Sequence, residues 1–330
     1  MVFKEAVMAK EQKQKRILPF IEHTKIWLSI SLILVIIAVG ALGVRGLNFG
    51  IDFAGGTTVT VNLHQAFKTE DIRSITKTFD KNADITYSGN AKQSAVISTK
   101  VSLNNLQQKK LLGDFQKRYP KVQQKDVSVD RITASVGRET TRNTILASLA
   151  AIALILVYVT IRFEFFFGLA SVIALFHDII VVIGVYALFQ IQVNSPFIAA
   201  ILTILGYSIN DTIVVFDRIR ENENEMGMAN IAEMTKLVDA SITQTLKRSI
   251  NTVATTLVAI IALYIFAVDA IRNFAMPLIV GIACGCYSSI FVASPLWVIF
   301  QKHAKKSRFN TKQHKRAKRR RDRKVEKIEV

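Results

Sequence analysis

The sequence predicts an α-helical membrane protein with six transmembrane helices and one extracytoplasmic α+β domain, of the ferredoxin-like βαββαβ kind, between helices 1 and 2. Three observations predict this fold class. Half of the 330 residues are hydrophobic, and long apolar blocks concentrate them in six places. One polar region, residues 45–142, separates the first block from the second, and its periodicity alternates between that of strands and that of helices. Basic residues gather at both ends of the chain, as they do on the cytoplasmic side of membrane proteins.

The six apolar blocks are the expected membrane spans, because each is about as long as the roughly 20 residues that cross a bilayer as a helix. They are Ile26–Val44, Thr144–Ile161, Phe165–Phe189, Phe197–Phe216, Ile250–Val268 and Phe274–Phe300. The first block begins after a 25-residue leader, so we expect a retained signal-anchor helix and not a cleaved signal peptide. This organisation excludes a soluble enzyme of one or two domains and a single-span anchor.

The net charge of +18 lies mainly in the two tails. Residues 301–330 hold 14 Lys and Arg against 3 Asp and Glu, and residues 1–25 hold 6 against 3. Both termini are therefore expected in the cytoplasm, which an even number of spans allows. The expected internal connections, 162–164 and 217–249, hold six Lys and Arg, whereas the expected external ones, 190–196 and 269–273, hold one.

Two features bear on cofactors and on partners at the tails. Cys284 and Cys286 both lie in the last apolar block and form neither a disulfide framework nor a metal motif, so we expect packing residues, no metal and no cofactor. No GxxxxGKS/T, GxGxxG, HExxH or GxSxG occurs, which gives an enzyme no support. The basic stretch Lys315–Lys324 suits anionic lipid, with nucleic acid or the ribosome as the alternative partner.

The polar region 45–142 is predicted to contain six elements of secondary structure in the order βαββαβ. A strand at Thr57–Leu63 follows the turn Gly55-Gly56, and Thr69 is the expected N-cap of the first helix. Ser102 is the expected cap of the second helix. The remaining strands are expected at Asp84–Tyr87, Gln93–Thr99 and Asp126–Thr133. The expected inward side chains of the second helix are Leu103, Leu106, Leu111 and Phe115.

The expected cytoplasmic loop 217–249 contains an amphipathic segment. Its apolar residues recur at helical spacing from Ile231 to Ile242, and Asn230 with Glu233 forms a potential capping box. We expect a helix on the inner membrane surface that leads into the fifth span.

Ionisable side chains inside a span are costly and mark candidate functional sites. The expected spans contain His177, Asp178 and Asp211. His177 and Asp178 are adjacent and diverge by about 100° on a helix, so they are not expected to share one ligand. Structural hydrogen bonding and a transport role remain open for this pair.

Asp211 is the stronger candidate for proton transfer. Ser208 and Thr212 lie on its side of the helix, and the small Gly206 would allow another helix to approach closely. Burial favours the protonated acid and a nearby cation favours the carboxylate, so a group balanced between them can load and release a proton. A permanently paired structural carboxylate is the alternative.

Arg248, just before the fifth span, is the expected counter-charge of Asp211. Lys247 is the competing candidate, and an ordinary basic flank of a membrane span is the alternative for both. In the sixth span, Gly281 and Gly285 form a small-xxx-small pattern that indicates tight helix packing.

Four motifs resemble those of SecF proteins, members of the SecD/SecF family in the resistance-nodulation-division superfamily. The motifs, which fall within residues 26–300, are Gly50–Thr57, Arg162-Phe163-Glu164 with Ala174–Asp178, Gly206–Asn222 and Thr243–Ile250. The resemblance implies half of a transporter in the bacterial cell (inner) membrane, paired with SecD. Such a pair uses the proton gradient to assist late steps of protein translocation through the SecYEG channel, where SecA supplies the ATP-driven step. It also implies YajC and unfolded precursor proteins as partners.

The resemblance places the key residues of the proton relay on Asp211 and Arg248. Secondary candidates are His177, Asp178, Asn210 and Thr212. Structural positions of the motifs fall on Gly50, Asp52, Gly55, Gly56, Gly206, Asp217, Arg218 and Arg220. The chain departs from the family pattern at Thr252-Val253, where Thr-Ser is frequent, and in its long basic tail.

Two other functions remain as alternatives. Half of a proton-driven small-molecule exporter would require a second six-span half and much larger external domains. A non-transporting scaffold of the translocation complex would not require an intramembrane carboxylate, so Asp211 argues against it.

Overall fold

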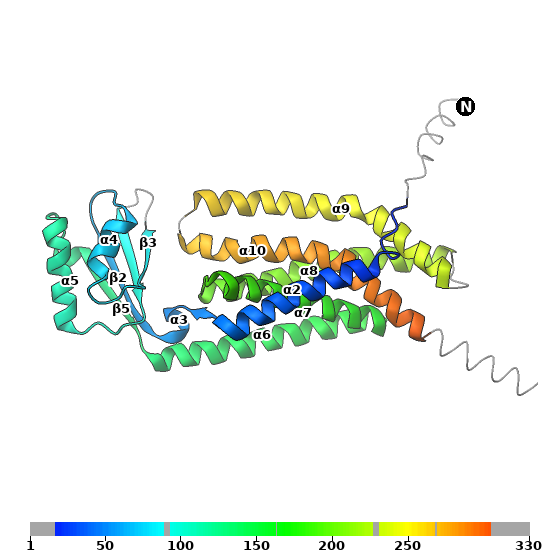
Figure 1. Ribbon diagram of the computed structural model, residues 1–330, viewed down its shortest axis with the longest axis horizontal. Coiled ribbons are helices and arrows are strands. Elements are labelled where there is room, and N and C mark those ends of the chain that lie inside the picture. The colour runs from blue at the N-terminus through cyan, green and yellow to red at the C-terminus, as the bar shows by residue number, and fades with distance from the viewer. Residues whose placement is uncertain (1–16, 89–92, 163, 227–230, 268, 305–330) are drawn as a thin grey trace, which may run out of the picture.

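The computed structural model describes residues 17–88, 93–162, 164–226, 231–267 and 269–304. A bundle of long helices occupies most of the length of the molecule, and a small domain of strands and short helices lies at one end (Figure 1). The expected cap Asn230, Phe163 of the second motif and the basic stretch Lys315–Lys324 lie outside the described residues.

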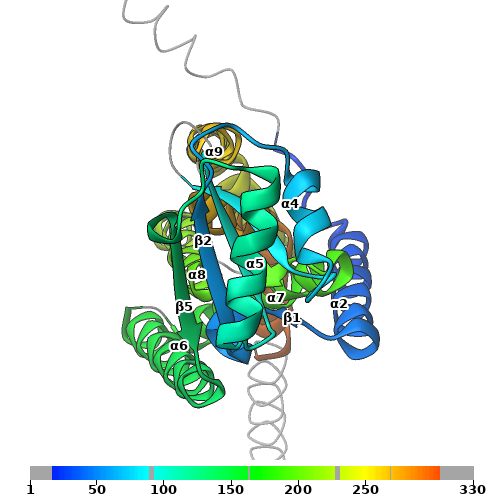
Figure 2. The same ribbon diagram turned by 90° about the vertical axis from the view of Figure 1, so that its left-hand side faces the viewer.

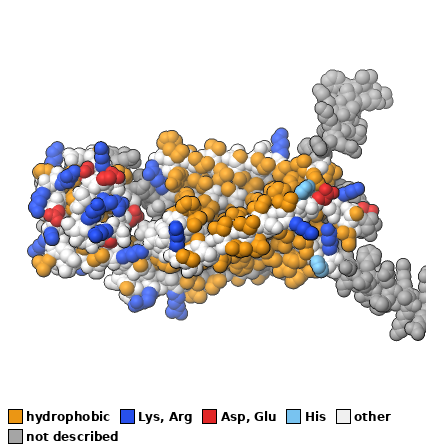
Figure 3. All heavy atoms as spheres, viewed as in Figure 1, with side chains coloured by type: hydrophobic (Ala, Val, Ile, Leu, Met, Phe, Trp, Pro, Cys, Tyr) orange, Lys and Arg blue, Asp and Glu red, His pale blue; other side chains and the backbone are white. Residues whose placement is uncertain are grey.

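Six helices in the described residues are long and apolar enough to cross a membrane, which confirms the predicted number of spans. They are α2 (Thr24–Arg45), α6 (Ala134–Arg162), α7 (Phe165–Phe189), α8 (Ser195–Met226), α9 (Ile231–Phe266) and α10 (Asp269–Ser288), which continues through the π-helical turn η2 (Ser289–Ala293). Helices α7, α8 and α10 are the most buried, whereas α2, α6 and α9 lie outside them and expose apolar side chains. Those side chains form the broad hydrophobic band of Figure 3, as expected of a surface that faces lipid.

Helix α9 differs from its prediction. It runs without interruption from Ile231 to Phe266, so the amphipathic segment and the fifth span are one helix. The apolar residues Met234 and Val238 are fully buried, in the same core as Phe216 and Ile219 of α8. The predicted helix does lead into the fifth span, but its apolar face packs on α8 and does not face lipid.

The extramembrane domain comprises the elements from β2 to β5. They are β2 (Gly56–Asn62), α4 (Thr69–Thr76), β3 (Asp84–Ser88), β4 (Ser94–Thr99), α5 (Asn105–Arg118), the 3₁₀ turn η1 (Gln124–Asp126) and β5 (Val127–Ile132). The sheet has the order β3-β4-β2-β5 with antiparallel neighbours. Seen from this end of the molecule, α4 and α5 lie in front of the strands (Figure 2). This topology confirms the predicted ferredoxin-like fold, since the first and third strands are the central ones.

Two predicted helix caps in this domain are wrong. Thr69 is the first residue of α4, and its hydroxyl bonds the Tyr87 hydroxyl at 2.9 Å instead of a backbone N–H. Asn104, not Ser102, caps α5 through a capping box with Gln107. Because α5 starts at Asn105, its inward face carries Leu111 and Phe115, and Leu106 is 78% exposed against expectation.

A junction that the sequence did not predict joins the two parts of the molecule. After α2, the two-residue strand β1 (Asn48–Phe49) pairs in parallel with β6 (Gln192–Val193), which lies between α7 and α8. The short helix α3 (Ile51–Ala54) follows and leads into β2. The segment that enters the extramembrane domain is therefore held against the start of α8.

Candidate functional site

The Asp178 carboxylate of α7 is fully engaged in hydrogen bonds at the centre of the bundle. Its Oδ2 accepts the hydroxyls of Ser208 from α8 at 2.6 Å and Ser288 from α10 at 2.8 Å. Its Oδ1 lies 3.1 Å from Nδ1 of His177 and accepts the thiol of Cys284 at 3.2 Å. A buried carboxylate with four partners is stabilised where it lies, and it links the three inner helices.

His177 and Asp178 share a partner, which the sequence argument did not expect. Both side chains are buried and reach Cys284, with His177 Nδ1 3.9 Å from the Cys284 sulfur. Neighbouring Cβ atoms on a helix diverge, but the imidazole and carboxylate extend beyond Cβ and converge on α10. The other ring nitrogen of His177, Nε2, is buried and has no hydrogen-bond partner.

Asp211 of α8 is buried in a different way. Its side chain is 9% exposed, and its Oδ2 has no hydrogen-bond partner. The carboxylate borders a small cavity, of about 20 Å³, between α8, α9 and α10. The lining residues are Tyr207, Ser208, Asn210, Asp211, Thr252, Val253, Thr256, Ile282, Gly285 and Cys286. A cavity of this volume is large enough to hold one water molecule beside a carboxylate.

Arg248 and Lys247 of α9 are both exposed, and neither forms an ion pair with Asp211 in the described part of the chain. Arg248 and the next residue, Ser249, are nevertheless the groups of α9 that lie close enough to the Asp211 carboxylate to interact with it electrostatically. Ser249 is buried, and its hydroxyl has no hydrogen-bond partner. The structure thus associates Arg248 with Asp211 but holds the two apart.

The secondary candidates beside Asp211 face different ways. Thr212 is buried, and its hydroxyl bonds that of Ser289, in the π-helical turn, at 2.8 Å. Such turns are frequent at functional sites, because the extra residue in the turn alters the helix locally. Asn210 is exposed and lines the same cavity as Asp211.

The close helix approach expected at Gly206 is wrong for the described residues, since nothing lies within 4 Å of a Cβ built there. The close approach occurs instead at Gly281 and Gly285 of α10. Ile204 of α8 lies against Gly281, and the Cβ of Ser208 lies 3.0 Å from a Cβ built on Gly285. This confirms the predicted packing of α10 and brings Ser208 to Asp178.

The glycine-rich motif after the first span forms the junction. Gly50 donates its N–H to the carbonyl of Val193 at 2.7 Å, and Asp52 accepts the N–H of Ser195, the first residue of α8, at 2.8 Å. Gly55 and Gly56 have φ angles of +79° and +156°, and a Cβ on Gly56 would collide with the Thr99 carbonyl. Glycine is required where the chain turns from α3 into β2.

The charged motif at the far end of α8 joins this helix to the first half of α9. Arg218 donates to Gln244, and Asn222 donates to Ser241 at 2.7 Å. Arg220 pairs with Asp217 at 3.0 Å, one turn away on the same helix. The contacts of Arg218 and Asn222 therefore join the last turns of α8 to the first half of α9.

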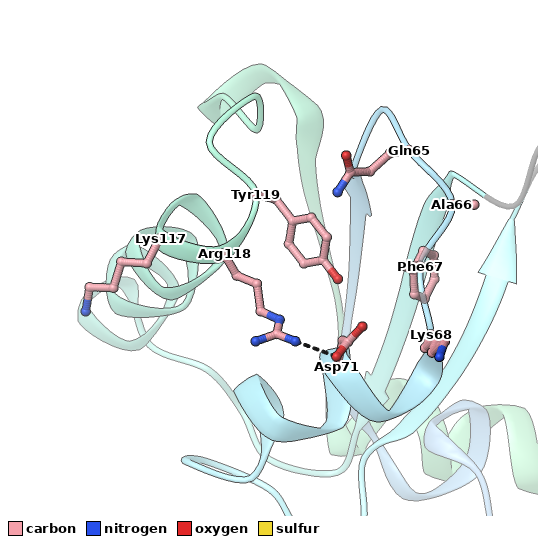
Figure 4. A pocket seen from close by; sticks show the side chains of 8 residues that line it. All are labelled: Gln65, Ala66, Phe67, Lys68, Asp71, Lys117, Arg118 and Tyr119. Atoms are coloured by element: carbon pink, nitrogen blue, oxygen red, sulfur yellow. Dashed lines mark hydrogen bonds and ion pairs between the residues drawn. The ribbon is translucent and has the colours of Figure 1, made fainter.

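The extramembrane domain has an open cleft of about 1040 Å³ that the sequence did not predict. Its lining residues come from the β2–α4 loop, α4 and the end of α5, and are labelled in Figure 4 as Gln65, Ala66, Phe67, Lys68, Asp71, Lys117, Arg118 and Tyr119. The ion pair of Arg118 with Asp71 crosses it, and the Asp71 hydrogen bond raises the pKa of Arg118. Burial raises the pKa of the Tyr119 hydroxyl. The cleft therefore combines three basic side chains and one carboxylate with the aromatic rings of Phe67 and Tyr119.

Comparisons with known proteins identify the family. The family model described as protein export membrane protein SecD/SecF, C-terminal, matches residues 113–303, and the SecD/SecF GG motif matches residues 40–66. The chain is 38% identical over 264 residues to the protein translocase subunit SecF of Alicyclobacillus acidocaldarius, covering 79% of this chain and 85% of that protein. It is 36% identical over 277 residues to the SecF subunit of Haemophilus influenzae, covering 83% of each.

Two solved structures have the same fold. The crystal structure of SecDF from Thermus thermophilus, described as a translocon-associated membrane protein, matches with a TM-score of 0.74 and 34% identity. That match covers 87% of this chain but only 39% of the solved one, so this chain spans about two fifths of that SecDF protein. A SecDF structure in a super-membrane-facing form matches with a TM-score of 0.69 and 33% identity, covering 89% and 40%. The family match, the identities and the shared fold together show that the chain belongs to the SecD/SecF family of protein-export membrane proteins, as a SecF-type translocase subunit.

Proposed function

We propose that this chain pairs with SecD and uses the proton gradient to assist the late steps of protein translocation through the SecYEG channel. In this proposal Asp211 carries the proton, and Arg248 controls when the carboxylate is charged. SecA, YajC and unfolded precursor proteins are the further partners.

The contrast between the two intramembrane carboxylates carries the proposal. Asp178 has four hydrogen-bond partners, so protonating it would disrupt contacts with α8 and α10. Asp211 has an oxygen without a partner and borders a cavity that fits one water molecule. A group that must bind and release protons needs a free oxygen and room for a water molecule beside it, and Asp211 has both. Asp178 therefore has the structural role, which was one of the two roles open for it.

The position of Arg248 supplies the control. Arg248 is exposed on α9 next to the buried Ser249, and it forms no ion pair with Asp211 among the described residues. If α9 moves so that the two groups meet, the carboxylate is favoured; if they part in a dry site, the protonated acid is favoured. A proton that moves down 100 mV releases about 2.3 kcal/mol. This is comparable to the few kcal/mol that separate conformational states, and is enough to bias the position of an extramembrane domain.

Exposed polar groups on α8 and α9 support a partner half in the membrane. Asn210 of α8 and Asn251 and Thr252 of α9 are exposed on helices whose neighbouring surface is apolar. Lipid cannot satisfy amide and hydroxyl groups, so another protein surface is needed to cover them. The solved SecDF chain is more than twice as long as the part that this chain matches, and we assign the remaining function to SecD.

The orientation follows from the distribution of basic residues. Helix α8 starts at Ser195 beside the junction with the extramembrane domain, so Arg218 lies near the opposite end of this helix. Arg218 donates to Gln244 of α9, and Lys247 and Arg248 follow closely on that helix. We propose that this end is cytoplasmic, with both termini inside and anionic lipid at the tails.

The decisive experiment measures translocation in inverted membrane vesicles that contain SecYEG, SecD and this chain. Asp211→Asn is compared with wild type and with Asp130→Asn, an exposed carboxylate on β5 that serves as the control. Translocation is followed with SecA and ATP, with and without a protonophore. The Asp211→Asn variant is expected to lose the protonophore-sensitive part by at least tenfold, about 1.4 kcal/mol, and to keep the part driven by SecA. Asp130→Asn should behave as wild type.

Normal gradient-dependent translocation by Asp211→Asn would contradict the assignment of Asp211 as proton carrier. It would favour the alternative of a non-transporting scaffold. Loss of small-molecule efflux, with translocation unchanged, would favour the exporter. Co-purification of the Asp211→Asn variant with SecD checks that assembly is intact.

A further inference from the structure

We propose that His177, Asp178 and Cys284 form a binding site for a divalent metal ion of the zinc class, between α7 and α10. This site is separate from the proton carrier and does not depend on the proposed transport function. Each residue offers one ligand atom of a type that Zn²⁺ prefers: an imidazole nitrogen, a carboxylate oxygen and a thiolate sulfur. The three ligand atoms lie within 4.8 Å of one another.

The distances among the ligand atoms are within about 0.4 Å of those on one face of a zinc tetrahedron. The Nδ1–Oδ1 distance is 3.1 Å, the Oδ1–Sγ distance is 3.2 Å and the Nδ1–Sγ distance is 3.9 Å. Zn–N and Zn–O bonds of about 2.1 Å and Zn–S bonds of about 2.3 Å give edges of about 3.4 Å without sulfur and about 3.6 Å with it. Shifts of a few tenths of an ångström would accommodate the ion.

The charges of the three ligands suit a buried divalent ion. Binding displaces the thiol proton of Cys284 to water and leaves a thiolate, while Nδ1 of His177 must bind in its unprotonated form. A divalent cation with one thiolate, one carboxylate and a neutral imidazole has no net charge. A neutral complex avoids the cost of leaving a charge in the interior of the membrane.

The surroundings orient the ligands. The hydroxyls of Ser208 and Ser288 hold Oδ2 of Asp178 and so turn its Oδ1 toward His177 and Cys284. Hydrogen bonds of this kind to a ligand carboxylate fix its geometry and support metal affinity. With Nδ1 bound to metal, the ring proton of His177 is on Nε2, the nitrogen that has no partner in the described chain. Cys284 is partly exposed, so the cluster is not fully enclosed by the described residues.

An ion here would connect α7 to α10 next to the π-helical turn. Ser288 precedes that turn, and Ser289 within it bonds Thr212, the neighbour of Asp211. A bound ion would thus restrict the inner helices and slow any motion that parts them. The same three contacts also work as hydrogen bonds without metal, so the experiment must separate these two states.

The test uses the purified full-length chain, stripped with chelator. Co²⁺ is titrated first, because a cobalt–thiolate bond has a charge-transfer absorption band, and Zn²⁺ is then added as competitor. The variants are Cys284→Ser, His177→Gln and the matched control Cys286→Ser, the second of the two cysteines of the chain. We expect the band in wild type and in Cys286→Ser, its absence in Cys284→Ser, and at least tenfold weaker Zn²⁺ binding in His177→Gln.

A second measurement does not depend on how the Cys284→Ser variant folds. In Cys286→Ser, Cys284 is the one remaining thiol, so maleimide labelling reports on it directly. Zn²⁺ at equimolar concentration is expected to slow that labelling at least tenfold. An unchanged labelling rate, or a cobalt band of equal strength in Cys284→Ser, would overturn the proposal and leave a hydrogen-bonded cluster only.

Discussion

The carboxylate of Asp52 accepts the backbone N–H of Ser195 at 2.8 Å, across 143 residues of sequence. Ser195 is the first residue of α8, the helix that carries Asp211, and Asp52 belongs to the short helix that leads into the extramembrane domain. The first N–H groups of a helix have no partner within the helix, and a carboxylate there also interacts favourably with the helix dipole. The contact therefore couples the domain to the helix with the candidate proton carrier.

Two substitutions of Asp52 should weaken this coupling to different extents. Asp52→Ala is expected to lower the free energy of unfolding by about 0.5–2 kcal/mol, since the N–H of Ser195 loses its acceptor. Asp52→Asn keeps an acceptor and loses only the charge, so its free energy of unfolding should fall by about 0.3–1 kcal/mol. Thermal unfolding of the purified chain in detergent measures both, with Asp130→Ala as the exposed control. Equal melting temperatures of Asp52→Ala and the control would show that the contact does not stabilise α8.

Two glycines of the extramembrane domain should respond in opposite ways to alanine. A Cβ on Gly56 meets the Thr99 carbonyl at a φ of +156°, so Gly56→Ala should destabilise the domain by about 1–3 kcal/mol. Gly113 lies inside α5 with open space around it, so Gly113→Ala should stabilise by about 0.5–1 kcal/mol. Hydrogen exchange of β2 and β4 amides in the full chain measures both changes. Greater protection in Gly56→Ala than in wild type would contradict the steric argument.

Arg248 and Lys247 offer a matched pair on α9. Both are exposed and basic, and Arg248 is the one that we propose as the counter-charge of Asp211. Arg248→Gln should reduce the protonophore-sensitive part of translocation about tenfold, equivalent to about 1.4 kcal/mol, whereas Lys247→Gln should leave it near wild type. Vesicle translocation assays with and without protonophore make the comparison. The reverse order of the two variants would identify Lys247 as the counter-charge.

Asp126 should make the extramembrane domain sensitive to acid. The N–H of Gln123 donates to its carboxylate at 2.8 Å and His64 bonds it at 3.1 Å, and these contacts lower the pKa of Asp126. Because the folded pKa lies below the unfolded value of about 3.9, the stabilisation is present above that pH and is lost as the pH falls through the folded pKa. The free energy of unfolding of the wild type should therefore fall more on acidification than that of Asp126→Asn. Parallel pH profiles of the two proteins would contradict this assignment.

The local patterns of the sequence predicted most of the elements. Strand β3 and helix α7 begin at the predicted residues, Asp84 and Phe165, because alternation and apolar length are properties of neighbouring residues. The caps of α4 and α5 were missed, since Ser, Thr and Asn near a helix start compete for one position. The contact of the amphipathic half of α9 with α8 was also missed, because an apolar face suits lipid and protein equally well.

The sequence by itself determined six spans, a βαββαβ domain, and a small set of ionisable residues inside the membrane. These follow from the composition and spacing of residues that are close along the chain. Only the tertiary structure decided how the ionisable residues differ. Asp178 takes its partners from Ser208 and Ser288, 30 and 110 residues away, while Asp211 is left with a free oxygen beside a cavity. Hydrogen bonds between helices depend on how α7, α8 and α10 pack, and that packing is not encoded in the spacing of any one segment.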